Sequence, residues 1–275
     1  MACPPGEAKN GMAIPGRKAK KYAGGPQSEQ SRKAVLLIGG LGTRLRSVLP
    51  STPKALAWIG DKSVLELLVQ QLRNQGFRRL VMCSGYLADQ IESRFGDGRA
   101  WDVVIEYSRE TEPLGTGGAV KLAQTLVQDA PEFLVMNGDS FLEIEFAKLI
   151  DFHSERRALA SMAVVPVHNA SRYGTVQVGL SNQVAAFAEK TGVDAPGMVN
   201  AGVYVFDCTI FNYIPEGPSS LERDVFPRIL DRGVYALEQH GMFIDIGTPD
   251  DYARAQALCE RLNTAASWKQ DRPAR

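Results

Sequence analysis

A glycine-rich loop follows directly on the first apolar run of the chain. Its sequence is Gly39-Gly40-Leu41-Gly42-Thr43-Arg44. Glycine adopts backbone dihedrals that other residues avoid, so several amide N–H groups of such a loop can turn toward one ligand. Unpaired amides at the end of a strand form a concavity that binds anions, most often phosphate. The loop therefore predicts a phosphate-binding site.

The loop fits neither of two familiar nucleotide-binding patterns. A P-loop ends in Gly-Lys-Ser/Thr, whereas Thr43-Arg44 follows the last glycine here. The dinucleotide pattern G-x-G-x-x-G is matched by Gly40 and Gly42, but Leu45 stands in place of its third glycine. The second predicted strand also ends in Met82-Cys83-Ser84-Gly85, without the acid that would bind a ribose. These differences disfavour a P-loop NTPase and leave an NAD-dependent oxidoreductase as the lesser alternative.

Two acidic residues follow short apolar runs further along the chain. Asp139 comes after Phe133–Met136, and Asp245 comes after Phe243-Ile244. Parallel sheets bind ligands at the carboxyl ends of their strands, and a carboxylate placed there can hold Mg²⁺. Taken singly, each acid could equally be a turn or capping residue.

The elements that would position these residues follow the pattern of β-α-β units. Short runs rich in β-branched residues alternate with amphipathic segments, which is typical of an α/β fold with a mainly parallel sheet. A helix is predicted where Ser63 and Glu66 form a capping box, and Gly76 ends it. Two further helices are expected after Gly85 and Thr116. The strands predicted in this half are Ala34–Ile38, Leu80–Cys83, Val103–Tyr107 and Phe133–Met136.

The second half of the chain predicts a more antiparallel arrangement. One helix is expected from Phe146 to Glu155. A last helix begins at Thr248-Pro249-Asp250-Asp251, because a capping threonine, an early proline and two acids favour a helix start, and it continues to about Asn263. The strands predicted here are Ala160–Val165, Thr175–Val178, Val184–Ala188 and Val199–Phe206.

Composition and charge indicate a globular protein with no polyanionic macromolecule as partner. Hydrophobic residues make up 44% of the 275 residues, and 31 basic residues balance 31 acidic ones, so no overall field would attract nucleic acid or an anionic membrane. The four cysteines form no C-x-x-C pair and no apolar run is long enough to span a bilayer, which favours a cytoplasmic protein. We expect a disordered extension over residues 1–31, one domain over 32–263 and a tail over 264–275.

Together these residues resemble the sugar nucleotidyltransferase family, whose signature is a first strand, G-G-x-G-T-R-L and a later Pro-Lys pair, supplied here by Pro53-Lys54. The resemblance implies a Rossmann-like, GT-A-like fold with a mixed, mainly parallel sheet flanked by helices. It implies transfer of a nucleoside monophosphate from an NTP to a sugar 1-phosphate, with Arg44 and Lys54 binding phosphates and Asp139 and Asp245 binding Mg²⁺. The nucleotide-binding residues that it implies in the glycine loop are Gly39, Gly40, Gly42 and Thr43.

Further elements of the family follow in the same order. Gly115 and Thr116 lie in a Pro-Leu-Gly-Thr element that the resemblance sets against the base and ribose, although a loop that caps a helix is the plain alternative. On the sugar side, the elements that resemble the family are Arg172-Tyr173-Gly174, Phe187-Ala188-Glu189-Lys190 and Asn200-Ala201-Gly202-Val203-Tyr204. The resemblance implies that Glu189 binds sugar hydroxyls and Lys190 binds the sugar phosphate. Gly174, through its backbone, and Asn200 complete the expected sugar-phosphate site.

Within the family, the chain resembles D-glycero-α-D-manno-heptose-1-phosphate guanylyltransferases. This likeness rests on Leu114-Gly115-Thr116-Gly117-Gly118-Ala119, Ser171-Arg172-Tyr173-Gly174 and the stretch from Ser220 to Pro227. It implies GTP and a heptose 1-phosphate as substrates. Two alternatives stay open: another substrate pair, such as UTP with N-acetylmuramate 1-phosphate or CTP or dTTP with a hexose 1-phosphate, and a catalytically silent paralogue that binds a nucleotide-sugar and regulates a partner.

The expected reaction needs no nucleophile or general base from the protein. A phosphate oxygen of the sugar 1-phosphate is already ionised and can attack the α-phosphorus directly. The three histidines, His153, His168 and His240, fall outside every motif. One departure from the family is Ile38, which replaces the usual alanine before the glycine pair. The sequence leaves the oligomeric state open, a homo-oligomer included.

Overall fold

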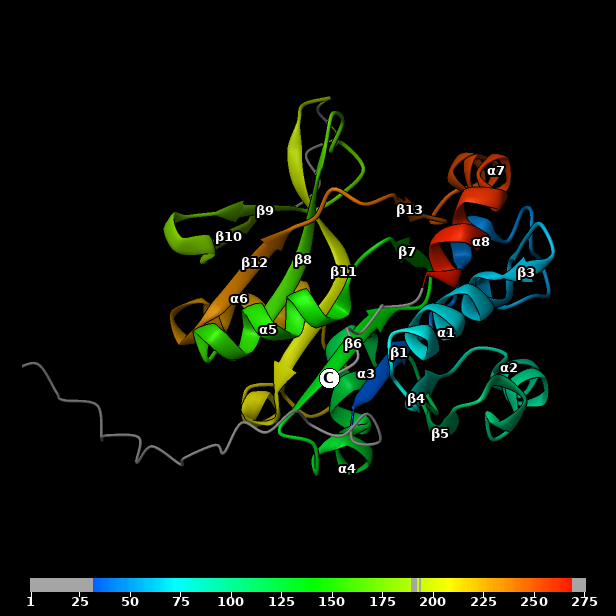
Figure 1. Cartoon of the computed structure of the whole chain (residues 1–275), viewed down its shortest axis with the longest axis horizontal. Helices are drawn as coiled ribbons and strands as arrows, with labels where there is room; N and C mark the ends of the chain where they lie inside the picture. The colour runs from blue at the N-terminus through cyan, green and yellow to red at the C-terminus, as the bar shows by residue number, and fades with distance from the viewer. Residues whose placement is uncertain (1–31, 189–191, 193, 269–275) are drawn as a thin grey trace, which may run out of the picture.

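A computed structural model describes residues 32–188, 192 and 194–268. The extension expected over residues 1–31 lies outside this part of the chain, as do the predicted sugar-site residues Glu189 and Lys190. The described residues build a nine-stranded sheet with the strand order β10-β9-β11-β6-β1-β4-β5, to which β8 and β12 are added through pairing of β8 with β11. In Figure 1 the strands β6, β1, β4 and β5 lie on one side of the molecule and the remaining strands of this sheet on the other.

The half of the sheet that carries the glycine loop is parallel. β1 pairs in parallel with both β4 and β6, and β4 pairs in parallel with β5. The carboxyl ends of these four strands therefore meet at one edge of the sheet. All four strands were predicted, with boundaries that differ by one or two residues, and they are β1 (Lys33–Leu37), β4 (Arg79–Ser84), β5 (Val104–Arg109) and β6 (Glu132–Asn137).

The other half is mostly antiparallel, as predicted. β11 pairs antiparallel with β6, β8 and β9, so it joins the two halves. Its register against β8 shifts between Asn200 and Tyr204, where Gly202 has a φ of 72°. The pattern missed β12, which pairs in parallel with β8. The strands of this half are β8 (Ala160–Val167), β9 (Thr175–Val178), β10 (Val184–Ala188), β11 (Gly197–Asp207) and β12 (Val234–Glu238).

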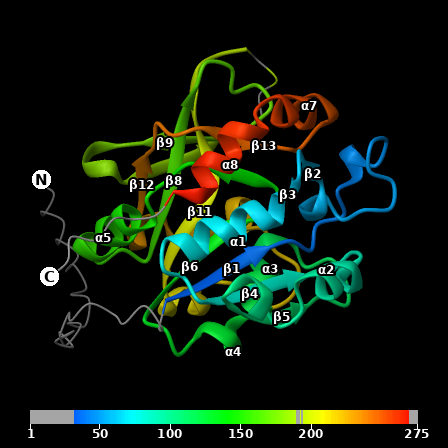
Figure 2. The same cartoon turned by 45° about the vertical axis from the view of Figure 1, so that its right-hand side comes forward.

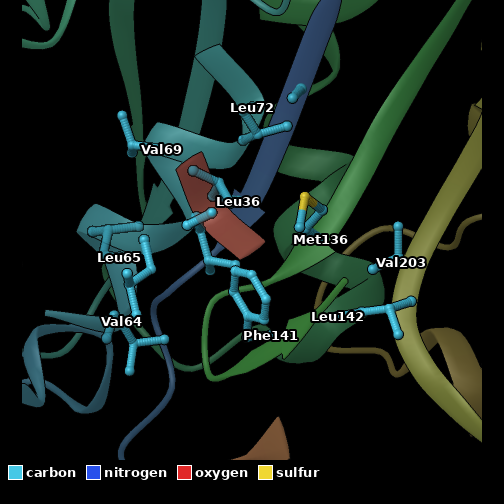
Figure 3. Packing of buried hydrophobic residues seen from close by; sticks show 14 of the residues in the cluster. Leu36, Val64, Leu65, Val69, Leu72, Met136, Phe141, Leu142 and Val203 are labelled. Carbon is cyan, nitrogen blue, oxygen red and sulfur yellow. The ribbon is translucent and has the colours of Figure 1, made fainter. Parts of the chain in front are cut away.

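Helices cover both faces of the sheet, because the buried residues of each strand alternate between two cores. In β1, Leu36 belongs to the core under α1 and Val35 to the core under α3. Figure 3 shows Leu65, Val69 and Leu72 of α1 facing the sheet beside Leu36. The first face carries α1 (Val64–Asn74), α2 (Ala88–Phe95) and α5 (Phe146–Arg156), and the second carries α3 (Gly115–Leu122), α4 (Gln124–Val127) and α6 (Phe226–Ile229). The predicted mixed sheet flanked by helices is confirmed.

The C-terminal helical segment differs from its prediction. A single helix to about Asn263 was expected, but the segment divides at Leu258 into α7 (Pro249–Ala257) and α8 (Cys259–Ser267). α8 continues past residue 263 because Ala265 and Ala266 are buried where α8 packs on α1, as Figure 2 shows. The expected boundary between domain and tail at residue 263 therefore falls inside a packed helix and is wrong.

Shorter elements complete the structure. β7 (Ser140–Leu142) and β13 (Phe243–Asp245) form a small antiparallel sheet, and β2 (Trp58–Ile59) pairs with β3 (Lys62–Ser63). 3₁₀ turns span Thr43–Leu45, Lys54–Leu56, Arg99–Trp101, Leu180–Asn182, Cys208–Asn212 and Leu230–Arg232, and a π-helical turn spans Leu221–Val225. Among the described residues, no helix has both the length and the apolar character needed to cross a membrane.

Candidate active site

A lysine and two carboxylates meet at the carboxyl edge of the parallel strands. Lys54 opens a 3₁₀ turn after Pro53, Asp139 lies two residues beyond β6, and Asp245 ends β13. The Lys54 Nζ atom is 2.6 Å from Asp139 Oδ2 and 3.7 Å from Asp245 Oδ1. The Ile246 amide donates a 3.0 Å hydrogen bond to the Asp139 carbonyl, which fixes β13 beside the end of β6. The structure thus brings these three sequence-predicted residues together.

The two carboxylates form a site that favours cations. Burial raises the pKa of Asp245, and the neighbouring Asp139 raises it further. Oδ1 of Asp245 is buried and has no hydrogen-bond partner within the described part of the chain. In that part, no cluster of three or more His, Cys, Asp or Glu side chains could hold a metal by itself. Two carboxylates fit a hard divalent cation whose other ligands are water and the oxygens of a bound anion.

The glycine loop forms one wall of a cavity above this edge. Gly42 adopts a left-handed conformation with a φ of 57°, and a Cβ at this position would lie 3.3 Å from the Lys54 Cβ. Thr43 and Arg44 are exposed in the following turn. The cavity has a volume of about 170 Å³ and is lined by Leu37, Ile38, Gly40, Gly42, Thr43, Arg44, Lys54, Ala55, Gly138, Asp139 and Gly247. It therefore unites the predicted glycine loop with Arg44, Lys54 and Asp139.

Close packing holds the backbone before Asp139 in place. The Gly138 amide donates a 2.9 Å hydrogen bond to the Leu37 carbonyl. A Cβ at Gly138 would lie 2.2 Å from Ile38 Cγ2 and 2.9 Å from the Leu37 oxygen. Because no larger residue fits at position 138, this glycine sets how closely the end of β6 approaches the end of β1.

Glu110 lies beside the glycine loop and was not singled out by the sequence interpretation. It follows β5, and its backbone amide donates to the Ser84 carbonyl at the end of β4. Its Oε2 accepts a 2.9 Å hydrogen bond from the Leu114 amide, while a Cβ at Gly39 would lie 3.0 Å from its Oε1. Burial raises the pKa of Glu110. The position of an acid after a predicted strand, which identified Asp139, was the signal that could have found it.

Gly115 and Thr116 lie at the start of α3, outside the 170 Å³ cavity. Gly115 is exposed with a φ of 70°, and a Cβ there would lie 2.6 Å from the Ser219 carbonyl oxygen. The Thr116 hydroxyl donates a 3.0 Å hydrogen bond to Glu222 Oε2. The Pro-Leu-Gly-Thr element therefore packs against the segment around Ser219. Its contact with a base stays a prediction.

The described residues of the predicted sugar-phosphate site, Gly174 and Asn200, lie just before β9 and on β11. Gly174 is exposed just before β9, and Asn200 on β11 donates a 2.8 Å hydrogen bond to the Tyr204 hydroxyl. β11 abuts the end of β6, because a Cβ at Gly202 would lie 2.5 Å from Asn137 Nδ2. Asn200 is thus close in the fold to the segment that carries Asp139, whereas the roles of Glu189 and Lys190 remain predictions.

An ion pair ties the loop before β9 to the segment after Asp245. The guanidinium of Arg172 makes two 2.9 Å hydrogen bonds to the carboxylate of Asp251, which is 4% exposed. Thr248 caps α7 and also donates a 2.7 Å hydrogen bond to Asp251. A two-pronged Arg–carboxylate pair of this kind fixes orientation as well as distance. It places the Arg172-Tyr173-Gly174 element beside the carboxylate edge.

A larger open groove lies between residues 52–58 and α2. Its volume is about 890 Å³, and it is lined by Thr52, Leu56, Trp58, Asp89, Gln90, Ser93 and Arg94. The charged groups in it are already paired, Asp89 with Arg109 and Arg94 with Glu66. Because the groove lacks the glycine loop and the two carboxylates, the smaller cavity is the better candidate for chemistry.

A glycine loop, a lysine and paired carboxylates at the edge of a parallel sheet define a nucleotide-binding transferase. The chain belongs to the nucleotidyl transferase family, whose model matches residues 33–261. It is 37% identical over 226 residues to D-glycero-alpha-D-manno-heptose 1-phosphate guanylyltransferase of Aneurinibacillus thermoaerophilus, covering 82% of this chain and 96% of that protein. It is 32% identical to mannose-1-phosphate guanylyltransferase catalytic subunit beta of Drosophila melanogaster, covering 86% of this chain but only 64% of the relative's length.

A solved structure shares the fold. HddC from Yersinia pseudotuberculosis aligns with a TM-score of 0.74 and 34% identity, covering 84% of this chain and 99% of HddC. HddC has also been solved in complex with GMP-PN, and that structure aligns with a TM-score of 0.73 and 33% identity. The family resemblance predicted from the glycine loop and the Pro-Lys pair is thereby confirmed.

Proposed function

We propose that this protein is a sugar-1-phosphate guanylyltransferase, which transfers GMP from GTP to a sugar 1-phosphate and releases pyrophosphate. The observation that carries the proposal is the position of Lys54 between Asp139 and Asp245, beside the glycine loop. A cation and two carboxylates next to a phosphate-binding loop suit phosphoryl chemistry, in which the protein mainly positions charged groups.

The reaction follows from what each residue can do. The amides of the glycine loop and the guanidinium of Arg44 bind the triphosphate, and Lys54 neutralises charge on the α-phosphoryl oxygens; the cavity that these residues share supports these roles. An oxygen of the sugar phosphate attacks the α-phosphorus, the bond to the bridging oxygen breaks, and pyrophosphate leaves with the bonding electron pair. Lys190 is proposed to reduce the repulsion between the two anionic substrates as they meet.

We further propose that Asp139 and Asp245 hold Mg²⁺. The buried Oδ1 of Asp245, which has no hydrogen-bond partner among the described residues, and the like charge of Asp139 support a divalent cation between these side chains. When bound, Mg²⁺ supplies positive charge that stabilises anionic phosphate oxygens. With the Asp139 carboxylate engaged in this way, the Lys54 ammonium group would bind phosphate oxygens of the nucleotide instead of that carboxylate.

Glu110 supports guanine as the base. An ionised carboxylate only accepts hydrogen bonds. Guanine presents adjacent N–H donors on its Watson–Crick edge, whereas uracil and thymine present an N–H between two carbonyl oxygens that a carboxylate would repel. Glu110 lies beside Gly39 and the Pro-Leu-Gly-Thr element, between the two loops that are proposed to hold the nucleotide. The names of the two relatives, both guanylyltransferases, support the same base.

The proposed sugar is D-glycero-α-D-manno-heptose, with mannose as the second candidate. The Aneurinibacillus relative acts on the heptose phosphate by name and matches this chain over nearly its whole length, while the Drosophila relative acts on mannose 1-phosphate. The heptose carries one hydroxyl-bearing carbon more than mannose, so a polar contact to that hydroxyl from the proposed sugar-side residues would decide between the two.

The test is a pyrophosphate-release assay with Mg²⁺ across four NTPs and both sugar 1-phosphates. We expect turnover with GTP and the heptose phosphate, and its loss in Asp139→Asn. Turnover with mannose 1-phosphate alone would replace the proposed sugar, and turnover with another NTP would replace the proposed base. A folded wild-type protein that binds GDP-sugar without turnover over the whole matrix would instead indicate the silent regulatory paralogue.

A further inference from the structure

One carboxylate collects three hydrogen bonds between the two halves of the proposed substrate site. Glu222 lies in the π-helical turn Leu221–Val225, a local irregularity often found near functional sites. Its Oε2 accepts from the Thr116 hydroxyl at 3.0 Å and from the Ser220 hydroxyl at 2.8 Å. Its Oε1 accepts from the Tyr204 hydroxyl at 3.0 Å. Tyr204, Ser220 and Glu222 fall in stretches that resemble the family, but of this cluster only Thr116 was assigned to the site from the sequence.

One arm of the cluster reaches Asn200. The Tyr204 side chain is fully buried, and its oxygen accepts the 2.8 Å hydrogen bond from Asn200 Nδ2 while its proton is donated to Glu222. Burial raises the pKa of Tyr204, and Glu222 raises it further, so the phenol stays protonated and keeps this direction of donation. Asn200 Oδ1 accepts from the Gly202 amide at 3.0 Å. The orientation of the Asn200 amide is therefore fixed at both ends.

The other arm reaches the start of α3. The Thr116 hydroxyl accepts from the Leu221 amide at 2.8 Å and donates to Glu222. The Gly117 amide also donates to the Ser219 carbonyl at 2.8 Å. Residues 219–222 thus hold the start of α3, next to Gly115, through these hydrogen bonds. The Glu222 carboxylate accepts one of them.

We propose that Glu222 is a positioning residue that holds the nucleotide-side turn at Gly115–Thr116 and the sugar-side Asn200 in one shared arrangement. The inference rests on the proposed function, since it assigns substrates to the two sides. A carboxylate is acceptor on both oxygens, so it satisfies Thr116, Ser220 and Tyr204 together. A glutamine turns an N–H₂ group toward at least one of these donors, and a buried donor without an acceptor is costly.

The arrangement predicts how single substitutions divide between the two substrates. Tyr204→Phe removes only the hydroxyl and leaves the hydrogen bonds between residues 219–222 and the start of α3. It should therefore raise the KM for the sugar 1-phosphate about tenfold and the KM for GTP less than about twofold. Glu222→Gln disturbs both arms and should raise both KM values by about tenfold. Glu216→Gln is the matched control, because Glu216 is an exposed carboxylate in the same segment whose ion pair in the described part of the chain is with Lys121. It should leave both KM values unchanged.

The experiment measures KM for each substrate, kcat, thermal unfolding and the calorimetric Kd for GTP·Mg²⁺ in the full-length protein and the three variants. The expected split between Tyr204→Phe and Glu222→Gln supports the inference. Wild-type KM values in Glu222→Gln would overturn it, as would a fall in kcat with unchanged KM values. If Glu222→Gln does not fold, an equal rise of both KM values in Tyr204→Phe overturns it instead. If the wild type shows no turnover, the proposed function is refuted but this inference is still tested. The test is then whether Glu222→Gln binds GTP·Mg²⁺ more weakly than Glu216→Gln does.

Discussion

The Nζ atom of Lys54 lies 2.6 Å from Oδ2 of Asp139, although the two residues belong to separate segments at the sheet edge. Lys54 begins a 3₁₀ turn, and its Nζ atom also lies 3.7 Å from Oδ1 of Asp245. The resting site therefore balances two carboxylates against one ammonium group. Such a site is prepared for additional positive charge and for the anionic oxygens that come with it.

Replacing Lys54 should cost turnover rather than stability. In Lys54→Met the ammonium group beside the carboxylates is lost, and we expect kcat to fall about 10²- to 10³-fold, the usual effect of removing one group that stabilises charge in a transition state. Pyrophosphate release measures this. Lys148→Met, at an exposed lysine paired with Glu145, is the control and should keep wild-type turnover. Lys54→Met with near-normal kcat would contradict the assigned role.

Removing the charge of Asp245 should stabilise the protein in the absence of ligands. Burial and the nearby Asp139 make the ionised form of Asp245 unfavourable, as its raised pKa indicates. In Asp245→Asn this repulsion disappears, and we expect the Tm in EDTA to rise by about 2–4 °C. The same variant should lose the further increase in Tm that Mg²⁺ with GTP gives the wild type. A lower Tm in EDTA would show that the carboxylate is stabilised by its surroundings instead.

Local rules were sufficient for much of the fold and for part of the site. The Ser63–Glu66 capping box and the threonine cap at Thr248 are both present, because caps depend on residues only a few positions apart. Asp139 was found by the same kind of rule, since an acid after a buried parallel strand lies at the ligand-binding edge.

The remaining features depend on contacts that no local pattern encodes. β12 was missed because its pairing with β8 joins segments far apart in sequence. The hydrogen bonds of Glu222 with Thr116 and Tyr204 join residues that other elements bring to it. The end of α8 was misplaced because packing on α1, rather than a stop signal, determines where that helix ends.

Glu110 should control the choice of base. Glu110→Gln places an N–H₂ group where guanine presents its own N–H donors, so we expect kcat/KM for GTP to fall by about 10- to 100-fold. Discrimination against UTP and dTTP should weaken, because a glutamine can pair with their N–H and carbonyl groups. The NTP matrix assay measures this change. Glu112→Gln, at an exposed neighbour in the same loop, should keep the preference for GTP, and an unchanged preference in Glu110→Gln would exclude this residue from base recognition.

Gly138 and Ile38 should show strong energetic coupling. Gly138→Ala introduces a methyl group 2.2 Å from Ile38 Cγ2 and should destabilise the protein by about 1–3 kcal/mol. Adding Ile38→Ala, which restores the residue usual in the family, makes room for that methyl group, so the double variant should be more stable than the sum of the single effects by about 0.5 kcal/mol or more. The recovery should be partial, because the Leu37 carbonyl at 2.9 Å remains.

Denaturant unfolding of the four proteins in this cycle measures the coupling. Gly40→Ala is the control for stability, since a Cβ at Gly40 would meet nothing within 4 Å. Strictly additive effects at positions 38 and 138 would show that the strand ends move apart to accept the methyl group.

His153 should affect stability in acid and leave the chemistry intact. Burial lowers the pKa of His153 from 6.5 to about 4, against a smaller opposing effect of Asp207. The unfolded chain therefore takes up a proton at a higher pH than the folded one, so stability is lost as pH falls from about 6.5 toward 4, by up to about 1.4 kcal/mol per pH unit. His153→Asn keeps a polar partner for Ser161 and lacks this titration, so its stability should fall less steeply over that range.

Unfolding at several pH values measures the slope of stability against pH for His153→Asn and the wild type. Turnover of the variant at neutral pH should stay within about threefold of wild type, because a phosphate nucleophile needs no histidine base. A variant that remains folded but inactive would refute direct attack by the sugar phosphate without a protein base.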